Sequence, residues 1–444
     1  MLTEGASEFP APASPARGAR SALTLLLLIN LFNYIDRYVL AAVEPAIQKD
    51  FFPKNPPNAE ALMGLLATAF IVSYMITAPI FGWLADRGSR WLIIGASVLV
   101  WSLATGASGL SGIFGGFALL FITRLFVGIG EGGYGPAAPT LLSDYFPIAH
   151  RGIVLSCFYL AIPVGSALGF VIGGKIADYF HSWHAAFYAV VIPGLLMGIA
   201  CFFFRDPPRG QADGAHGPPR LGSLHDYMAL LRNRSYVLNS LGMTAMTFAI
   251  GGISFWIPKY LVDRGNAGTL AEVNYKFGLI TVVAGFLATL LGGLVGDFVQ
   301  KWFASSYLLV SGIAMFIACP FVLKMLDAPF PLAWVYLGLA IFFMFFNTGP
   351  TNTALANVSH PSVRATAFAL NILIIHALGD AAAPPILGKI AHVAGWNRAF
   401  QLVAAMMALA GVFWIWGSFY LARDTQAASR DVAPGGFPVI PPMG

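Results

Sequence analysis

The sequence has little charge for its length. Lys, Arg, Asp and Glu make up 10% of its 444 residues, whereas hydrophobic residues make up 57% and the mean hydropathy is +0.73. A soluble protein of this length could not bury that much apolar surface in one core, so lipid must surround most of these side chains. The sequence therefore predicts an all-α membrane protein.

Cysteine is also scarce. The three cysteines, Cys157, Cys201 and Cys319, lie inside apolar runs and lack the spacing of metal ligands. They are typical of small core residues, so we expect neither a disulfide nor a bound metal.

Enzyme signatures are missing as well. Gly106-Ala-Ser-Gly109 fits the pattern of intramembrane serine proteases, but nothing places a histidine base opposite it. Leu378-Gly-Asp380 is similar to one motif of an aspartyl membrane protease, but the second Asp motif is absent. No glycine-rich loop with Lys and Ser or Thr is present to hold nucleotide phosphates. We therefore expect no enzyme and no cofactor, with a proton gradient as the driving force.

Twelve apolar segments run through the chain, each long enough to cross a hydrocarbon core of about 30 Å. They lie at residues 21–48, 60–84, 91–109, 114–142, 152–176, 184–204, 235–260, 275–297, 303–325, 332–356, 364–391 and 398–421. We expect a disordered tail over 1–20, a six-helix bundle over 21–204, a cytoplasmic linker over 205–234, a second six-helix bundle over 235–422 and a disordered tail over 423–444.

The two halves repeat each other in order, at offsets of 211 to 214 residues. The repeated elements are Gly82-x-x-x-Asp86-x-x-x-Arg90 with Gly293-x-x-x-Asp297-x-x-x-Lys301, Gly135-Pro136 with Gly349-Pro350, Arg151 with Arg364, Gly174-Lys-Ile-Ala177 with Gly388-Lys-Ile-Ala391, and Trp183-x-x-Ala-Phe187 with Trp396-x-x-Ala-Phe400. Five echoes at nearly one offset do not arise by chance. Two parallel six-helix halves with a substrate site between them are a transporter architecture.

Lysine and arginine predict the orientation. With both termini inside, fourteen of these residues fall on the cytoplasmic side and nine on the other. The lysines and arginines are scattered in short clusters between apolar runs. Orientation in the membrane therefore explains the net charge of +5, and we expect no nucleic-acid partner. We expect a monomeric, multi-pass protein of a bacterial inner membrane, with both termini cytoplasmic.

These residues resemble the major facilitator superfamily over roughly residues 21–422. Gly82-Trp-Leu-Ala-Asp86-Arg87-Gly-Ser-Arg90 is similar to the signature loop between that family's second and third helices, and the resemblance implies that it locks the cytoplasmic side. A plain positive-inside turn is the alternative reading. The predicted cytoplasmic gate comprises Gly82, Asp86, Arg87, Arg90, Arg151, Asp297, Lys301 and Arg364.

A narrower resemblance is to the Spinster branch, the lysolipid and sphingosine-phosphate transporters. It rests on Asn33-Tyr-Ile-Asp36-Arg37 and on Arg124-Leu-Phe-Val-Gly-Ile-Gly-Glu131, followed by Tyr134 and Ala138-Pro-Thr140. The first of these motifs also occurs in the branch that carries small organic anions.

Four charged residues lie well inside predicted spans: Asp36, Arg37, Arg124 and Glu131. Charge at that depth is costly and marks function, facing a cavity and paired. Arg124 and Glu131 are seven residues apart on one helix face, so Asp36 is expected between them. We predict that Asp36, Arg124 and Glu131 couple proton binding to a conformational step. A structural ion pair between helices is the alternative.

Arg37 is the predicted anchor for a phosphate or carboxylate, within a polar stripe on the first helix. The other candidate substrate residues are Asn30, Asn33, Tyr34, Tyr134, Tyr159, Asn371, His376 and Asp380. Packing hydrogen bonds are the alternative role for each. His376 and Asp380 stand at i and i+4 on the eleventh helix and can titrate together.

The predicted function is proton-coupled transport of an amphiphilic anionic lipid, of the lysophospholipid or sphingosine-phosphate type, by alternating access. The nearest alternative is a proton-coupled symporter of small organic anions such as sugar acids. A non-transporting receptor or scaffold is more remote, since it would not need titratable residues in the membrane.

Overall fold

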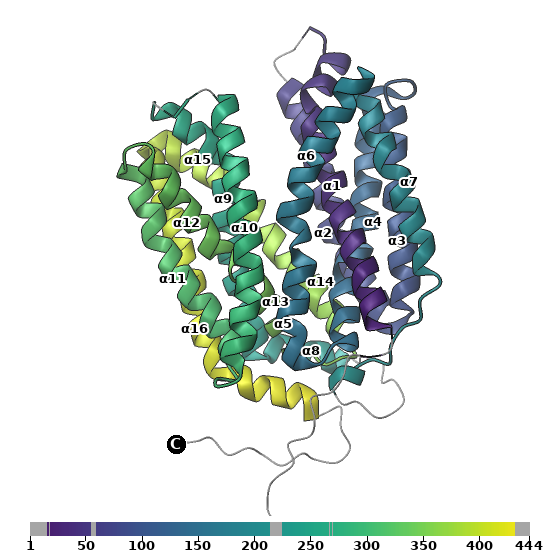
Figure 1. Cartoon of the computed structure of the whole chain (residues 1–444), viewed down its shortest axis with the longest axis vertical. Helices are drawn as coiled ribbons and strands as arrows, with labels where there is room; N and C mark the ends of the chain where they lie inside the picture. The colour runs from purple at the N-terminus through teal and green to yellow at the C-terminus, as the bar shows by residue number, and fades with distance from the viewer. Residues whose placement is uncertain are drawn as a thin grey trace, which may run out of the picture.

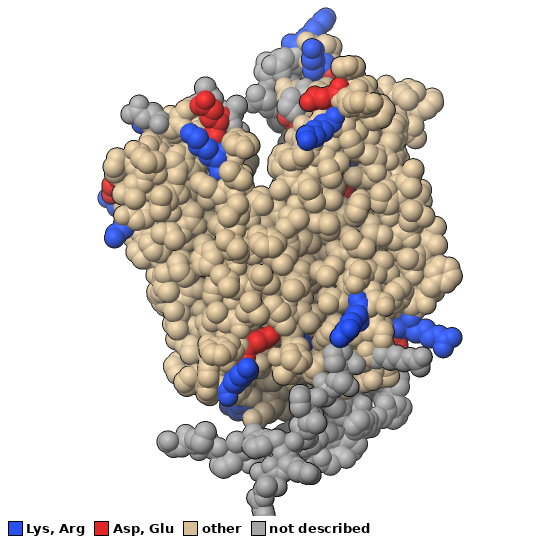
Figure 2. All heavy atoms as spheres, viewed as in Figure 1, with Lys and Arg blue, Asp and Glu red and all other residues tan. Residues whose placement is uncertain are grey.

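The computed structural model describes residues 16, 18–54, 59–213, 224–265, 267–268 and 270–430. Within these residues the regular structure is entirely helical, and twelve stretches are long and apolar enough to cross a membrane (Figure 1). Figure 2 shows charged side chains gathered at the two ends of the molecule, with an almost uncharged belt between them. The predicted all-α, twelve-span fold is therefore confirmed.

The N-terminal half holds α1 (Ala19–Phe51), α2 (Ala59–Arg87), α3 (Arg90–Leu110), α4 (Gly116–Tyr145), α5 (Arg151–Tyr159), α6 (Ala161–Phe180) and α7 (Trp183–Cys201). The C-terminal half holds α9 (Arg234–Asp263), α10 (Leu270–Gln300), α11 (Ser306–Asp327), α12 (Leu332–Phe345), α13 (Thr348–Val358), α14 (Arg364–Ile375), the π-helix η3 (His376–Asp380), α15 (Ala383–Ala394) and α16 (Trp396–Arg430). Between the halves lie η2 (Gln211–Asp213) and α8 (Leu224–Arg232), and η1 (Ile148–His150) precedes α5.

Three predicted spans are interrupted, and proline explains each interruption. Pro163, Pro350 and Pro384 have no backbone N–H, so the carbonyl four residues earlier loses its helical partner. The first two prolines follow the α5/α6 and α12/α13 breaks. Before Pro384 the helix widens into η3, where the Ala381 N–H bonds the His376 carbonyl at 3.2 Å.

The two halves touch most closely at one end, which we call the linker face because α1 begins and α16 ends there (Figure 1). A Cβ on Gly82 would lie 2.6 Å from Ala369 Cβ of α14, and one on Gly349 would lie 1.7 Å from Ser156 Oγ of α5. Small residues therefore let the halves close here. At the opposite end, the cleft face, Figure 2 shows a cleft between the two lobes.

The C-terminal end is helical further along the chain than expected. Helix α16 continues to Arg430, eight residues into the segment 423–444 that was predicted to be disordered. Asp424 holds it there, because its carboxylate accepts from Ser235 N at 3.1 Å and Ser235 Oγ at 2.8 Å. Most of the predicted tail 1–20, and residues 431–444, lie outside the described residues.

Candidate functional site

Arg37 and Glu131 form an ion pair at the centre of the N-terminal half. Arg37 Nε lies 2.6 Å from Glu131 Oε2, which joins α1 to α4. The Glu131 side chain is 1% exposed and that of Arg37 is 21% exposed. The predicted substrate anchor and a predicted proton-coupling carboxylate therefore belong to one site. If either side chain moves away, the other is left as an unpaired charge.

Three aromatic rings surround the Arg37 guanidinium. Its Cζ lies 5.0 Å from the ring centre of Tyr34, 4.9 Å from that of Phe70 and 5.1 Å from that of Tyr74. Each ring face attracts the cation, so this cage keeps Arg37 in place when its anionic partner changes. Phe70 and Tyr74 on α2 were missed in the sequence because aromatic residues in a membrane helix are typical of packing.

Asp36 and Arg124 also take neutral hydrogen-bond partners on α3. Asp36 Oδ2 accepts from Thr105 Oγ1 at 2.6 Å, and Arg124 Nη2 donates to Ser108 Oγ at 2.7 Å. Asp36 still lies within electrostatic range of both Arg124 and Glu131, as the sequence predicted, while Arg37 is the ion-pair partner of Glu131. Thr105 and Ser108 were also missed, although their i, i+3 spacing on an apolar span is a readable signal.

Several buried polar atoms of this cluster have no hydrogen-bond partner within the described part of the chain. Asp36 Oδ1 and Arg124 Nε are two of them. Unsatisfied polar atoms at such depth are costly and uncommon, and they call for a proton, a water or a ligand. The cluster therefore retains capacity to bind.

A cavity of about 500 Å³ adjoins the cluster, lined by α1, α2 and α4. Arg37 and Arg124 supply its positive charge, and Glu44 also reaches it. Much of the remaining wall is apolar, from Leu40, Ala41, Met63, Leu66, Ala67 and Val127. Its chemistry suits an anionic head joined to an apolar tail.

The C-terminal half approaches this site through His376 and Asp380 of η3. His376 Nδ1 lies 3.0 Å from Asp380 Oδ2, and the His376 ring centre is 5.6 Å from that of Tyr74. Tyr74 therefore stands between Arg37 of one half and His376 of the other. The i, i+4 pair expected from the sequence is present in the structure.

The other candidate substrate residues have partners inside or between the bundles. Asn30 Nδ2 donates to the Phe158 carbonyl at 2.8 Å, and Tyr134 Oη donates to the Leu26 carbonyl at 2.8 Å. Asn371 is 1% exposed, and its Nδ2 lies 3.4 Å from Met243 Sδ. Tyr159 reaches across the halves, where its hydroxyl bonds Asn352 Oδ1 at 3.0 Å. The geometry thus gives Asn30, Tyr134 and Asn371 packing contacts.

At the linker face, a carboxylate from each half meets the first turn of a helix in the other. Asp86 accepts from the N–H groups of Ala365 and Thr366, both at 2.9 Å, and from Thr366 Oγ1 at 2.5 Å. Asp297 accepts from Ile153 N at 2.9 Å. The free N–H groups and positive dipole end of α14 and of α5 suit these anions.

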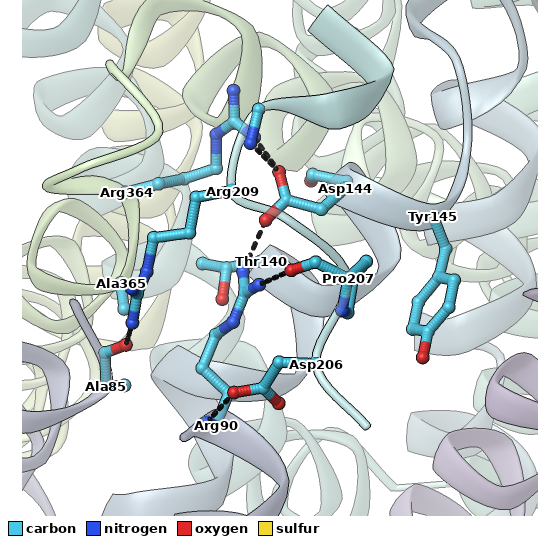
Figure 3. A network of polar contacts seen from close by, with 12 residues as sticks. Ala85, Arg90, Thr140, Asp144, Tyr145, Asp206, Pro207, Arg209, Arg364 and Ala365 are labelled. Carbon is cyan, nitrogen blue, oxygen red and sulfur yellow. Dashed lines mark hydrogen bonds and ion pairs between the residues drawn. The ribbon is translucent and has the colours of Figure 1, made fainter. Parts of the chain in front are cut away.

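A third carboxylate, that of Asp144, joins arginines from both halves (Figure 3). It lies 2.5 Å from Arg90 Nη1 and 3.0 Å from Arg364 Nη1. Arg151 adds a further inter-half bond, from its Nη1 to Asn357 Oδ1 at 2.9 Å. Of the remaining predicted gate residues, Arg87 places its guanidinium over Trp83 and Lys301 is exposed.

Comparison with known proteins gives consistent matches. A family model described as Major Facilitator Superfamily matches residues 26–384. Protein spinster homolog 3 of Danio rerio is 33% identical over 428 residues, which cover 90% of this chain and 84% of that protein. The Danio rerio protein named sphingosine-1-phosphate transporter SPNS2 is 32% identical over 435 residues, which cover 91% of this chain and 84% of that protein.

Solved structures show the same fold at lower identity. The E. coli fucose:proton symporter FucP matches with a TM-score of 0.73 at 16% identity, covering 90% of this chain and 99% of that one. A bacterial homolog to the human lysosomal transporter Spinster, inward-facing and unoccupied, matches with a TM-score of 0.59 at 21% identity, covering 95% and 100%.

Proposed function

The chain belongs to the Spinster branch of the major facilitator superfamily, a family of integral membrane transporters, and from this premise we propose that it carries an amphiphilic anionic lipid in exchange with or alongside protons. The observation that carries the proposal is the Arg37–Glu131 ion pair beside a cavity with a charged end and apolar walls. The name of the relative that carries sphingosine-1-phosphate supports the same class of substrate.

Competition for Arg37 provides the coupling. An anionic head that binds the guanidinium displaces the Glu131 carboxylate, which would then be a buried and unpaired charge. Taking up a proton removes that charge, so anion binding and Glu131 protonation favour each other. Asp36, which lies near Arg124 and accepts from the Thr105 hydroxyl, is the second proton carrier in this scheme.

The cavity walls support the lipid over the sugar acid. A sugar acid needs a ring of amide and hydroxyl groups, whereas Leu40, Met63 and Leu66 offer apolar contact. The substrate class that fits best is therefore a lipid with one acyl or sphingoid chain.

Alternating access supplies the transport step in this proposal. The linker face, which we assign to the cytoplasm from the distribution of Lys and Arg, is held shut by Asp86, Asp144 and Asp297 while the cleft face is open. Rocking the two halves would break these contacts and expose the site to the other side.

The test is counterflow in proteoliposomes, with a panel of lysophospholipids against small carboxylates, run with and without a pH gradient. We expect exchange of lysophospholipids, accelerated by the gradient, and none of sugar acids. Exchange of the carboxylates alone would replace the lipid proposal with the organic-anion alternative. Rates that do not depend on the gradient would contradict proton coupling.

A further inference from the structure

The first residues of the linker double back over the linker face of the N-terminal half. We call Asp206–Gly210 the strap. Asp206 caps the start of α3, because its carboxylate accepts from Arg90 N at 2.8 Å and Trp91 N at 3.0 Å (Figure 3). The Pro207 carbonyl accepts from Arg90 Nη2 at 3.2 Å. The strap therefore holds both the backbone and the side chain of Arg90.

Arg209 fastens the strap to the end of α2. Its Nη2 donates to the Ala85 carbonyl at 2.9 Å and to the Gly88 carbonyl at 2.7 Å. Burial lowers the pKa of Arg209 from its ordinary value, and the nearby charge of Arg90 acts in the same direction. Asp86, Asp206 and Asp144 oppose these effects, so the guanidinium lies among anions that retain its charge.

The last residue of the strap bonds the carboxylate that joins the halves. Gly210 N donates to Asp144 Oδ1 at 3.0 Å, the same oxygen that accepts from Arg364 of the C-terminal half. The other oxygen, Oδ2, accepts from Arg90. The strap therefore contacts Asp144 directly through Gly210 and indirectly through Arg90.

We propose that the strap is a working part of the linker-face lock: it positions Asp144 to accept from Arg364 and so sets how often this face opens. The described contacts of the strap lie on α2, α3 and α4 of one half. When Arg364 withdraws, Arg90 and Gly210 keep the buried Asp144 satisfied. This makes opening reversible, because a buried carboxylate left without partners would be strongly unfavourable.

The N–H groups of Ala365 and Thr366 report the state of the lock, since Asp86 covers them only when the linker face is shut. Hydrogen exchange of the first turn of α14, in the full chain in lipid nanodiscs, measures that opening without substrate or a pH gradient. Arg209→Ala and Asp206→Asn are expected to speed this exchange about tenfold, the effect of losing a hydrogen bond to a charged group.

Arg205→Ala is the matched control. It removes the same charge from the adjoining residue, whose side chain is exposed and whose carbonyl accepts from Tyr145. Exchange in this variant is expected at the wild-type rate. Arg364→Ala removes the partner across the interface and is expected to give the largest acceleration.

A double variant separates positioning from simple stabilisation. If the strap acts through Asp144 and Arg364, adding Arg209→Ala to Arg364→Ala changes exchange little further. The proposal would be overturned if the two accelerations multiplied in the double variant, or if Arg209→Ala and Arg205→Ala exchanged at equal rates. Uniform acceleration of exchange in all helices would also overturn it.

The inference rests on the alternating-access part of the proposed function and is independent of substrate and protons. No acceleration in Arg364→Ala would overturn the lock itself and the strap with it. Acceleration in Arg364→Ala without any in Arg209→Ala would overturn the strap alone.

Discussion

The two halves of the molecule repeat one fold but differ in their buried charge. At the offset of 214 residues that relates Gly135 to Gly349, Arg124 and Glu131 correspond to Gly338 and Phe345. The N-terminal half thus carries an ion pair and a cavity, whereas the equivalent helix in the other half is uncharged at both positions. The repeat supplies the scaffold, and only the N-terminal copy carries charges at these two positions.

The linker-face contacts show the opposite behaviour. Asp86 and Asp297 are repeat-related; Asp86 accepts from two N–H groups in the first turn of α14, and Asp297 from one in the first turn of α5. Both copies keep this contact because each half presents one free helix N-terminus at the interface. The comparison teaches that the contacts closing this face come from both halves, whereas the proposed anion site lies in one.

The largest effect is expected from substituting Arg37 in the N-terminal half. Arg37→Ala removes the anion anchor and leaves Glu131 buried without its partner. Removing one partner of a buried ion pair costs about 3–5 kcal/mol of free energy. Lysolipid counterflow should fall at least a hundredfold, on the order of 10² or more for that energy. Counterflow near the wild-type rate would show that the anion binds elsewhere.

Glu131→Gln should weaken the coupling of lipid transport to the proton gradient. In the wild type, anion affinity should rise as pH falls, because a protonated Glu131 releases Arg37 for the anion. The amide cannot titrate, so the variant should bind with an affinity that varies less with pH and should exchange lipid with a weaker response to a gradient. Binding titrations from pH 5 to 8 check this, and an unchanged pH slope would contradict it.

The two repeated caps should differ in strength. Asp86 accepts three hydrogen bonds from α14, whereas Asp297 accepts one from α5 and a second from Tyr307 Oη at 2.8 Å in its own half. Asp86→Asn should therefore open the linker face more than Asp297→Asn, each by about 1–3 kcal/mol. Hydrogen exchange in the first turns of α14 and α5 measures both, and the reverse order would refute the comparison.

The smallest effect is expected at Lys301, the repeat-related counterpart of Arg90. Lys301 is exposed, whereas Arg90 is 3% exposed and bonded to Asp144. Lys301→Ala should change transport by less than threefold, since exposed charges contribute about 0–1 kcal/mol. Arg90→Ala is the matched comparison and should impair it clearly. Equal losses would mean that the positive charge alone matters.

The sequence was sufficient for the architecture and for the residues of the charged cluster. Hydropathy and the internal repeat predicted twelve spans in two halves, and intramembrane charge singled out Asp36, Arg37, Arg124 and Glu131. The pairing among them was not predictable. Helical spacing relates residues on one helix, but Glu131 and Arg37 come from α4 and α1, whose relative rotation depends on packing.

What the sequence determined by itself follows from the cost of polar groups in lipid: helices must span, charges must gather at a cavity, and small residues must stand where helices cross. Tertiary structure alone decided which partner each charge takes. It set three rings around Arg37, gave Asp36 a hydroxyl from α3, and brought the linker to Asp144. These contacts join segments far apart in the chain, and only the packing of the helices brings them within hydrogen-bond distance.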